Sequence, residues 1–266
     1  IESGDRVAIL SRNSPTYVEA LYGCAKAEAL YVALNWRLAQ PELEYIVDDA
    51  DPSVLVYDPS FSDTVEGLRD VADIDHYVAL PDPTMEPDTD SDDDGPAADD
   101  PATDDSADDP AADDPADDPA ANESGNGSTV SSDDEEYETM LDTAGPGRHR
   151  MPPRDRSDTW GLLYTSGTTG RPKGVRQTFD MVLYNYLNIG IPSDLTSKDT
   201  TLNVLPFFHT GGLNLYTNPT LIAGGTALVQ PTFDPSEALR VLEERATVFF
   251  GVPAIYQALY DEETFA

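Results

Sequence analysis

Apolar and polar positions alternate along the first part of the chain in blocks of strand and helix length. Short apolar runs, which predict strands, lie at residues 7–10, 31–34, 53–57 and 76–80. Between them apolar residues recur at helical spacing, which predicts helices at residues 17–29, 41–50 and 63–71. Ser14 followed by Pro15 is a helix-start signal before the first of these. Strands separated by helices of about ten residues predict βαβ units and a mostly parallel sheet.

The same alternation resumes near residue 159 and continues to the end of the chain. Predicted strands lie at residues 160–164, 201–205, 226–230 and 247–251. Predicted helices lie around 180–187, within 213–221, at 235–244 and from residue 253. The pattern therefore predicts an α/β fold of layered, parallel-rich sheets flanked by helices, interrupted by one insertion.

Composition changes abruptly between these two parts. Residues 82–142 hold 24 of the 51 acidic side chains and no Lys or Arg, and variants of Asp-Asp-Pro-Ala repeat through them. Such a segment buries too little apolar surface to offset the entropy of ordering, so we expect it to be mostly disordered. Closing a long loop costs only about 0.6 kcal/mol more per doubling of its length. We therefore predict one N-terminal domain built from residues 1–80 and 159–266, with 81–158 as an acidic low-complexity insertion.

Charge and cysteine content exclude several classes of protein. The formal charge is −36, and outside residues 82–142 there are still 27 acidic residues against 15 basic ones, of which three are lysines. This balance argues against binding nucleic acid or an anionic membrane surface. In dilute buffer the excess acidic side chains repel one another, whereas molar salt shortens the Debye length to about 3 Å and screens that repulsion. The composition therefore favours a protein that works in concentrated salt, as in a halophilic archaeon. Cys24 is the only cysteine, so a disulfide framework is excluded.

Targeting signals are not found in the sequence. No run approaches the about 20 apolar residues that span a bilayer, and no basic segment precedes an apolar one at the start of the chain. We therefore expect a cytoplasmic protein without a membrane span.

A loop rich in glycine and hydroxyl groups follows the strand predicted at 160–164. Residues 164–174 read Tyr-Thr-Ser-Gly-Thr-Thr-Gly-Arg-Pro-Lys-Gly. Glycines let backbone N–H groups converge on an anion, hydroxyls add donors, and the lysine adds a compact positive charge. The spacing differs from the common P-loop, in which Lys directly follows Gly and precedes Ser or Thr. The alternative is a Ser- and Gly-rich surface turn, but the combination of glycines, hydroxyl groups and a lysine favours a polyphosphate-binding loop.

This loop resembles the phosphate-binding signature of the adenylate-forming superfamily, in particular its acyl-CoA synthetases. Residues 205–213, Leu-Pro-Phe-Phe-His-Thr-Gly-Gly-Leu, resemble that family's second core motif, in which an aromatic-His pair borders the carboxylate pocket. Residues 4–10, 34–38 and 246–253 also match, so the resemblance covers everything but the insertion.

The resemblance implies an ATP-dependent acid–CoA ligase that uses Mg²⁺. A carboxylate would attack ATP to give an acyl-adenylate and pyrophosphate, and CoA would then displace AMP. Lys173 and His209 would be the catalytic residues, and Phe208, Gly211 and Gly212 would shape the acyl entrance. Thr165 is also implied as a Mg²⁺ ligand. The residues implied to hold the ATP phosphates are Thr165, Ser166, Gly167, Thr168, Thr169, Gly170 and Lys173.

The second motif also narrows the substrate. Amino-acid-activating relatives place an Asp there, whereas this chain has Phe208-His209-Thr210, which favours a fatty or aryl acid. His209 could instead be a packed histidine at a strand end. The family's adenine, Mg²⁺ and ribose motifs and its C-terminal domain do not occur in the chain, so we expect an inactive fragment of a longer enzyme. A nucleotide- or acyl-binding protein without catalysis, and an interaction protein working through its acidic tract, remain alternatives. Oligomeric state is left open.

Overall fold

A seven-stranded sheet forms the first half of the structure, a computed structural model that describes residues 1–81, 130–144, 153–165 and 171–262. The strand order is β5-β4-β3-β1-β2-β6-β7, and every neighbouring pair is parallel except β6 and β7. Its strands are β1 (Arg6–Leu10), β2 (Leu30–Ala33), β3 (Val54–Tyr57), β4 (His76–Ala79), β5 (Glu135–Glu136), β6 (Thr159–Thr165) and β7 (Lys173–Thr178).

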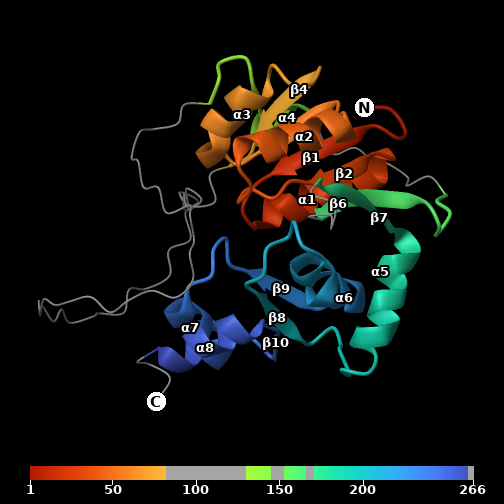
Figure 1. The fold of residues 1–266 in the computed structure, drawn as a ribbon. Helices are drawn as coiled ribbons and strands as arrows, with labels where there is room; N and C mark the ends of the chain where they lie inside the picture. Colours follow the sequence, from red (N-terminus) through yellow and green to blue (C-terminus); the bar gives the residue numbers. More distant parts are fainter. Residues whose placement is uncertain (82–129, 145–152, 166–170, 263–266) are drawn as a thin grey trace, which may run out of the picture.

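A second, smaller sheet lies below the first in Figure 1. It is parallel, with the order β10-β8-β9, and its strands are β8 (Thr200–Asn203), β9 (Thr226–Val229) and β10 (Val248–Phe249). The helix α5 (Phe179–Asn185) leaves β7 and runs along one side of the molecule toward this second sheet (Figure 1). The prediction of layered, parallel-rich sheets is confirmed.

The helices follow the start signals that the sequence carries. At α1 (Pro15–Ala27) the Ser14 side chain accepts a hydrogen bond from the backbone N–H of Tyr17, as an N-cap does. The remaining α-helices are α2 (Gln40–Ala50), α3 (Ser62–Leu68), α4 (Tyr137–Ala144), α6 (Asn218–Ala223), α7 (Pro235–Glu244) and α8 (Pro253–Asp261). A 3₁₀ turn, η1 (Pro59–Phe61), and two π-helical segments, η2 (Tyr186–Gly190) and η3 (Gly211–Thr217), complete the described helices. No helix among these is long and apolar enough to cross a membrane.

Successive residues of β1 point to opposite faces of the first sheet and contribute to the core on both. Val7 and Ile9 pack on the side of α1, whereas Ala8 and Leu10 pack on the side of α2 and α3. Phe207, from the segment that follows β8, also packs on the α1 side, with its ring 5.3 Å from that of Tyr17. The first sheet is thus buried on both faces, and the first core continues into the chain segment that follows β8.

Three elements were not expected from the sequence. β7 was missed because Lys173–Thr178 is a polar, mostly exposed edge strand without apolar alternation. β5 and α4 were missed because they lie within the acidic range 81–158 that was expected to be mostly disordered. Residues 82–129 and 145–152 of that insertion lie outside the described residues, so the division of the chain stays a prediction.

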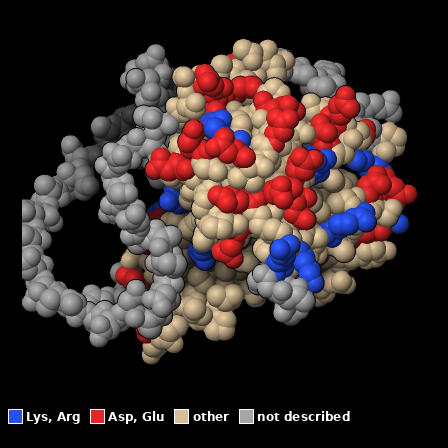
Figure 2. All heavy atoms as spheres, turned by 45° about the horizontal axis from the view of Figure 1, so that its top comes forward, with Lys and Arg blue, Asp and Glu red and all other residues tan. Residues whose placement is uncertain are grey.

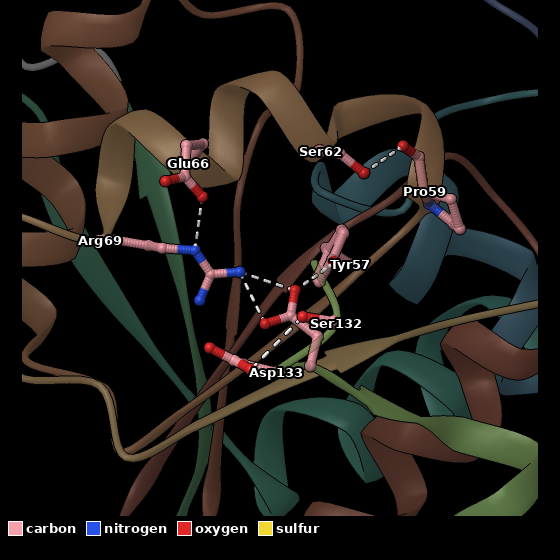
Figure 3. A network of polar contacts seen from close by, with 8 residues as sticks. Tyr57, Pro59, Ser62, Glu66, Arg69, Ser132 and Asp133 are labelled. Carbon is pink, nitrogen blue, oxygen red and sulfur yellow. Dashed lines mark hydrogen bonds and ion pairs between the residues drawn. The ribbon is translucent and has the colours of Figure 1, made fainter. Parts of the chain in front are cut away.

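A buried ion pair fixes the chain where it re-enters the first sheet. The carboxylate of Asp134, 1% exposed, accepts hydrogen bonds of 2.6 and 2.7 Å from one nitrogen of Arg69. The hydroxyl of Tyr57 donates to the same carboxylate at 2.5 Å, and Arg69 also donates to Glu66 at 2.8 Å. Figure 3 shows this network between β3, α3 and the segment before β5. It explains why an acid-rich stretch can hold an ordered strand at the edge of the sheet.

Candidate functional site

The phosphate-binding loop predicted at 164–174 is the connection of the β6–β7 hairpin. Thr165 ends β6, Lys173 begins β7, and the two are direct partners in the antiparallel register. Direct partners on such strands have Cα atoms about 5 Å apart and side chains on the same face. Both residues are exposed, so their side chains leave neighbouring positions on the same face of the hairpin. Ser166, Gly167, Thr168, Thr169 and Gly170 lie outside the described residues.

The loop end of this hairpin contacts α2. The hydroxyl of Tyr164 donates a hydrogen bond to Asp49 at 2.7 Å, and the guanidinium of Arg171 lies 5.6 Å from the ring centroid of Tyr45. Gly174 keeps room for Tyr164, since a Cβ there would come within 3.2 Å of its ring. These contacts were not foreseen, because nothing in the α2 sequence marks Tyr45 or Asp49 as neighbours of the loop.

The second predicted motif forms a turn directly after β8. The carbonyl of His209 accepts hydrogen bonds from the N–H groups of Gly212 (3.1 Å) and Leu213 (3.2 Å), which starts η3. The His209 ring is exposed and packs on Phe208, with 4.7 Å between ring centroids. Phe208 is buried and meets Trp36 edge to face at 6.1 Å. The turn therefore presents an imidazole beside a buried aromatic wall.

Two influences lower the pKa of His209. Partial desolvation of the ring comes first, and the positive charge of Arg37 second. The Arg37 guanidinium is held 4.9 Å from the Trp36 ring centroid. A lowered pKa keeps the imidazole neutral at neutral pH, so it can donate or accept a proton in a hydrogen bond.

The two glycines of the turn differ in their surroundings. A Cβ on Gly212 would lie 2.3 Å from the carbonyl oxygen of Pro206 and 2.4 Å from that of Leu205. A Cβ on Gly211 would meet only Leu205, at an ordinary 3.7 Å. Gly212 is therefore required by close backbone packing, whereas Gly211 is not.

A buried amide connects the His209 turn to the phosphate hairpin. The Nδ2 group of Asn214 donates to the hydroxyl of Thr210 and to the side-chain carbonyl of Gln177, both at 3.2 Å. Gln177 lies in β7, four residues after Lys173, which corresponds to about 13 Å along a strand. The two predicted motifs, more than thirty residues apart in sequence, thus lie on packed neighbouring elements. Asn214 and Asn13, which contacts the same turn, were not singled out from the sequence, where an asparagine carries no distinguishing signal.

A Mg²⁺ ion requires more ligands than the described residues supply at this site. Magnesium prefers oxygen ligands, commonly one or two carboxylates beside phosphate oxygens. Within the described ranges no group of three or more His, Cys, Asp or Glu side chains is arranged to hold a metal ion. Thr165 offers a single hydroxyl, so these residues do not by themselves form a Mg²⁺ site.

Several characterised proteins are similar to this chain in sequence. The chain is 33% identical to a feruloyl-CoA synthase of Amycolatopsis sp, over 97% of this chain and 40% of that protein. It is 32% identical to an indoleacetate–CoA ligase of Aromatoleum aromaticum (93% and 40%) and 27% identical to a long-chain-fatty-acid–CoA ligase of Thermus thermophilus (97% and 39%). The chain thus spans about 40% of the length of these relatives.

Solved structures of CoA ligases have a similar fold, and a family model matches the chain. ATP-bound MatB from Rhodopseudomonas palustris superposes with a TM-score of 0.68 at 27% identity, covering 99% of this chain and 42% of that one. The anthranilate CoA ligase AuaEII with anthranoyl-AMP gives a TM-score of 0.75 at 20% identity (100% and 43%), which supports the fold alone. The family described as "AMP-binding enzyme" matches residues 1–266. With its hairpin and histidine turn in the expected order, the chain belongs to the AMP-binding enzyme family.

Proposed function

We propose that this chain forms the phosphate- and acyl-binding part of an ATP-dependent acid–CoA ligase. In the first step a carboxylate oxygen attacks the α-phosphorus of ATP, giving an acyl-adenylate and pyrophosphate. In the second the CoA thiol attacks the acyl carbon and AMP leaves. The observation that carries this proposal is the arrangement of the Thr165–Lys173 hairpin beside the His209 turn. Because ATP and CoA are intracellular substrates, we assign the enzyme to the cytoplasm.

On the phosphate side, Lys173 and Thr165 act together with residues 166–170. The ammonium group of Lys173 binds the β- and γ-phosphates and stabilises the charge that develops on the departing pyrophosphate. The Thr165 hydroxyl adds a hydrogen bond and is a proposed ligand of Mg²⁺. Such groups act by positioning the phosphates and by stabilising charge, because the protein forms no covalent bond with the substrate in this step.

On the acyl side, His209 lies next to the reacting carboxylate. A neutral imidazole can donate one hydrogen bond to a carboxylate oxygen without pairing so strongly that it hinders attack. Phe208, Gly211 and Gly212 shape the entrance, and the aromatic wall of Phe208 and Trp36 suits a flat acid. Relatives named for ferulate and indoleacetate support an aryl or arylalkyl acid over a long fatty acid.

The test is acid-dependent ATP–pyrophosphate exchange by the product of the complete reading frame. Ferulate, indoleacetate, palmitate and an amino acid are compared, with CoA-dependent AMP release as the second readout. We expect the highest exchange with ferulate or indoleacetate, less with palmitate, and none with the amino acid. Lys173→Ala lowers exchange by about 10²-fold or more if it stabilises the developing charge, whereas the matched control Lys198→Ala, on an exposed turn, leaves it unchanged. Binding of ATP without exchange for any acid would instead support a nucleotide-binding protein.

We further propose that the protein works in concentrated salt, as in a halophilic archaeon. Figure 2 shows carboxylates spread over one face, with smaller patches of Lys and Arg side chains among them. In dilute buffer these like charges repel, and salt screens them within a few ångströms. The midpoint of urea unfolding should rise steadily between about 0.1 and 3 M KCl, where the Debye length falls from about 10 Å to below 3 Å. A midpoint that does not change with KCl contradicts the proposal.

A further inference from the structure

Asn13 is a buried side chain that touches three backbone groups in the segments that directly follow β8 and β9. It lies between the end of β1 and the start of α1 and is 4% exposed. Its Nδ2 group donates to the carbonyl of Leu205 at 2.9 Å and to that of Gln230 at 3.2 Å. Its Oδ1 accepts from the N–H of Phe207 at 2.8 Å.

These three hydrogen bonds require two donors and one acceptor on a single short side chain. A carboxamide provides two N–H donors and one acceptor on a single rigid plane. Leu205 and Phe207 follow β8, and Gln230 follows β9. One side chain of the first sheet therefore fixes the carboxyl ends of two strands of the second sheet, at sequence separations of 192 to 217 residues.

The segment that Asn13 holds leads directly into the His209 turn. Leu205 and Phe207 immediately precede Phe208 and His209, and the N–H of His209 bonds back to the carbonyl of Pro206 at 3.1 Å. Phe207 is also packed 5.3 Å from Tyr17 of α1, so the same segment is fixed by packing and by hydrogen bonds. A shift of residues 205–207 would therefore move the imidazole.

We propose that Asn13 is a positioning residue that sets the place of the His209 turn, and so of the bound acid, relative to the first sheet. This inference rests on the proposed function for its kinetic consequence. Asn13 acts through the backbone of residues 205–207 and does not touch substrate. Its loss should affect use of the acid far more than binding of the phosphates, because Tyr164 and Asp49 hold the loop end of the β6–β7 hairpin separately. The contact of the hairpin with the His209 turn, through Gln177, lies about 13 Å farther along β7.

Two variants and one control test the proposal in the product of the complete reading frame. Asn13→Ala removes all three bonds. Asn13→Asp keeps the shape and the acceptor, but its second oxygen would face the carbonyls of Leu205 and Gln230. Tyr57→Phe is the control, since it removes one buried hydrogen bond, to Asp134, at a different part of the first sheet. All are measured at high salt and low temperature, where folding is checked by circular dichroism.

For both Asn13 variants we expect kcat/KM for the acid to fall at least tenfold while the Kd for ATP changes less than twofold. Because burial raises the pKa of a carboxyl group, Asn13→Asp should recover activity relative to wild type as pH falls and its acid proton becomes a donor. Tyr57→Phe should leave both constants unchanged. Equal losses for acid and ATP, or unchanged kinetics in a destabilised but folded variant, would overturn the positioning role.

A second readout does not depend on activity. The imidazole signal of His209, assigned with a His209→Gln variant, is titrated by NMR. Asn13→Ala should move the pKa of His209 toward its ordinary value, because the displaced ring loses part of its desolvation, and Tyr57→Phe should not. Failure of exchange in the wild-type enzyme would count against the proposed function alone, whereas an unmoved His209 pKa would count against the role of Asn13.

Discussion

Adding one methyl group at Gly212 tests the close backbone packing of the His209 turn. In Gly212→Ala the new Cβ would lie 2.3 Å from the carbonyl oxygen of Pro206 and 2.4 Å from that of Leu205. An ordinary carbon–oxygen contact is about 3.3 Å or longer, so the backbone must move by about 1 Å. Neither obstacle is the end of a flexible side chain, and the strain cannot be relieved by a rotamer change.

The neighbouring glycine provides a matched control. In Gly211→Ala the Cβ would meet Leu205 at 3.7 Å, an ordinary contact. Neither glycine has a positive φ, so alanine is compatible with the backbone at both. The two substitutions therefore add the same atom to the same η3 segment and differ in what that atom touches.

The expected sizes follow from these contacts. Overpacking of a well-packed interior costs about 1–3 kcal/mol. Gly→Ala at a compatible position stabilises by about 0.4–1 kcal/mol, through the entropy of the unfolded chain. With a slope of roughly 2 kcal/mol per M urea, Gly212→Ala lowers the unfolding midpoint by about 0.5–1.5 M and Gly211→Ala raises it by about 0.2–0.5 M.

Urea unfolding followed by tryptophan fluorescence measures both variants. Trp36 lies 6.1 Å from Phe208, so its emission also reports a displaced turn in the folded state. We expect a lower midpoint and altered native emission for Gly212→Ala only. Equal midpoints for the two variants, or a Gly212→Ala protein as stable as wild type, would refute the argument that backbone packing requires this glycine.

Two further predictions concern charge. Arg69→Met leaves the carboxylate of Asp134 buried without its cation and should lower the free energy of unfolding by about 3–5 kcal/mol. Arg240→Met removes only exposed ion pairs and should lower it far less. Similar losses for the two variants in urea titrations would contradict the difference in burial. His209 should titrate below its ordinary pKa of 6.5 in NMR, and Arg37→Gln should raise that pKa only part of the way, because desolvation is the larger cause. The folded-state pKa of His209 lies below the unfolded one. The stability that the neutral ring contributes is therefore present above the unfolded pKa and is lost as pH falls through the folded pKa. An unchanged His209 pKa in Arg37→Gln would show that the charge of Arg37 does not contribute to the lowered pKa.

Much of the fold was readable because local patterns agree with the tertiary packing. β1 to β4 are buried on both faces, so their apolar runs stand out, and Ser14 caps α1 as its sequence indicates. β7 could not be read, since an exposed edge strand needs no apolar alternation. β5 could not be read either, because its order depends on a pair between Asp134 and Arg69, 65 residues apart.

The order of residues along the chain sets which chemical groups are available and how they are spaced. The loop at 164–174 and the Phe208-His209 pair carry their signal in consecutive residues, since phosphate binding and close backbone approach require particular residue types at fixed spacing. The tertiary structure decided how these groups meet. Only folding makes Thr165 the partner of Lys173, connects Gln177 with Asn214, and brings Asn13 to the carbonyl of Leu205. Such contacts depend on distances between segments far apart in the chain, and local side-chain pattern contains no information about them.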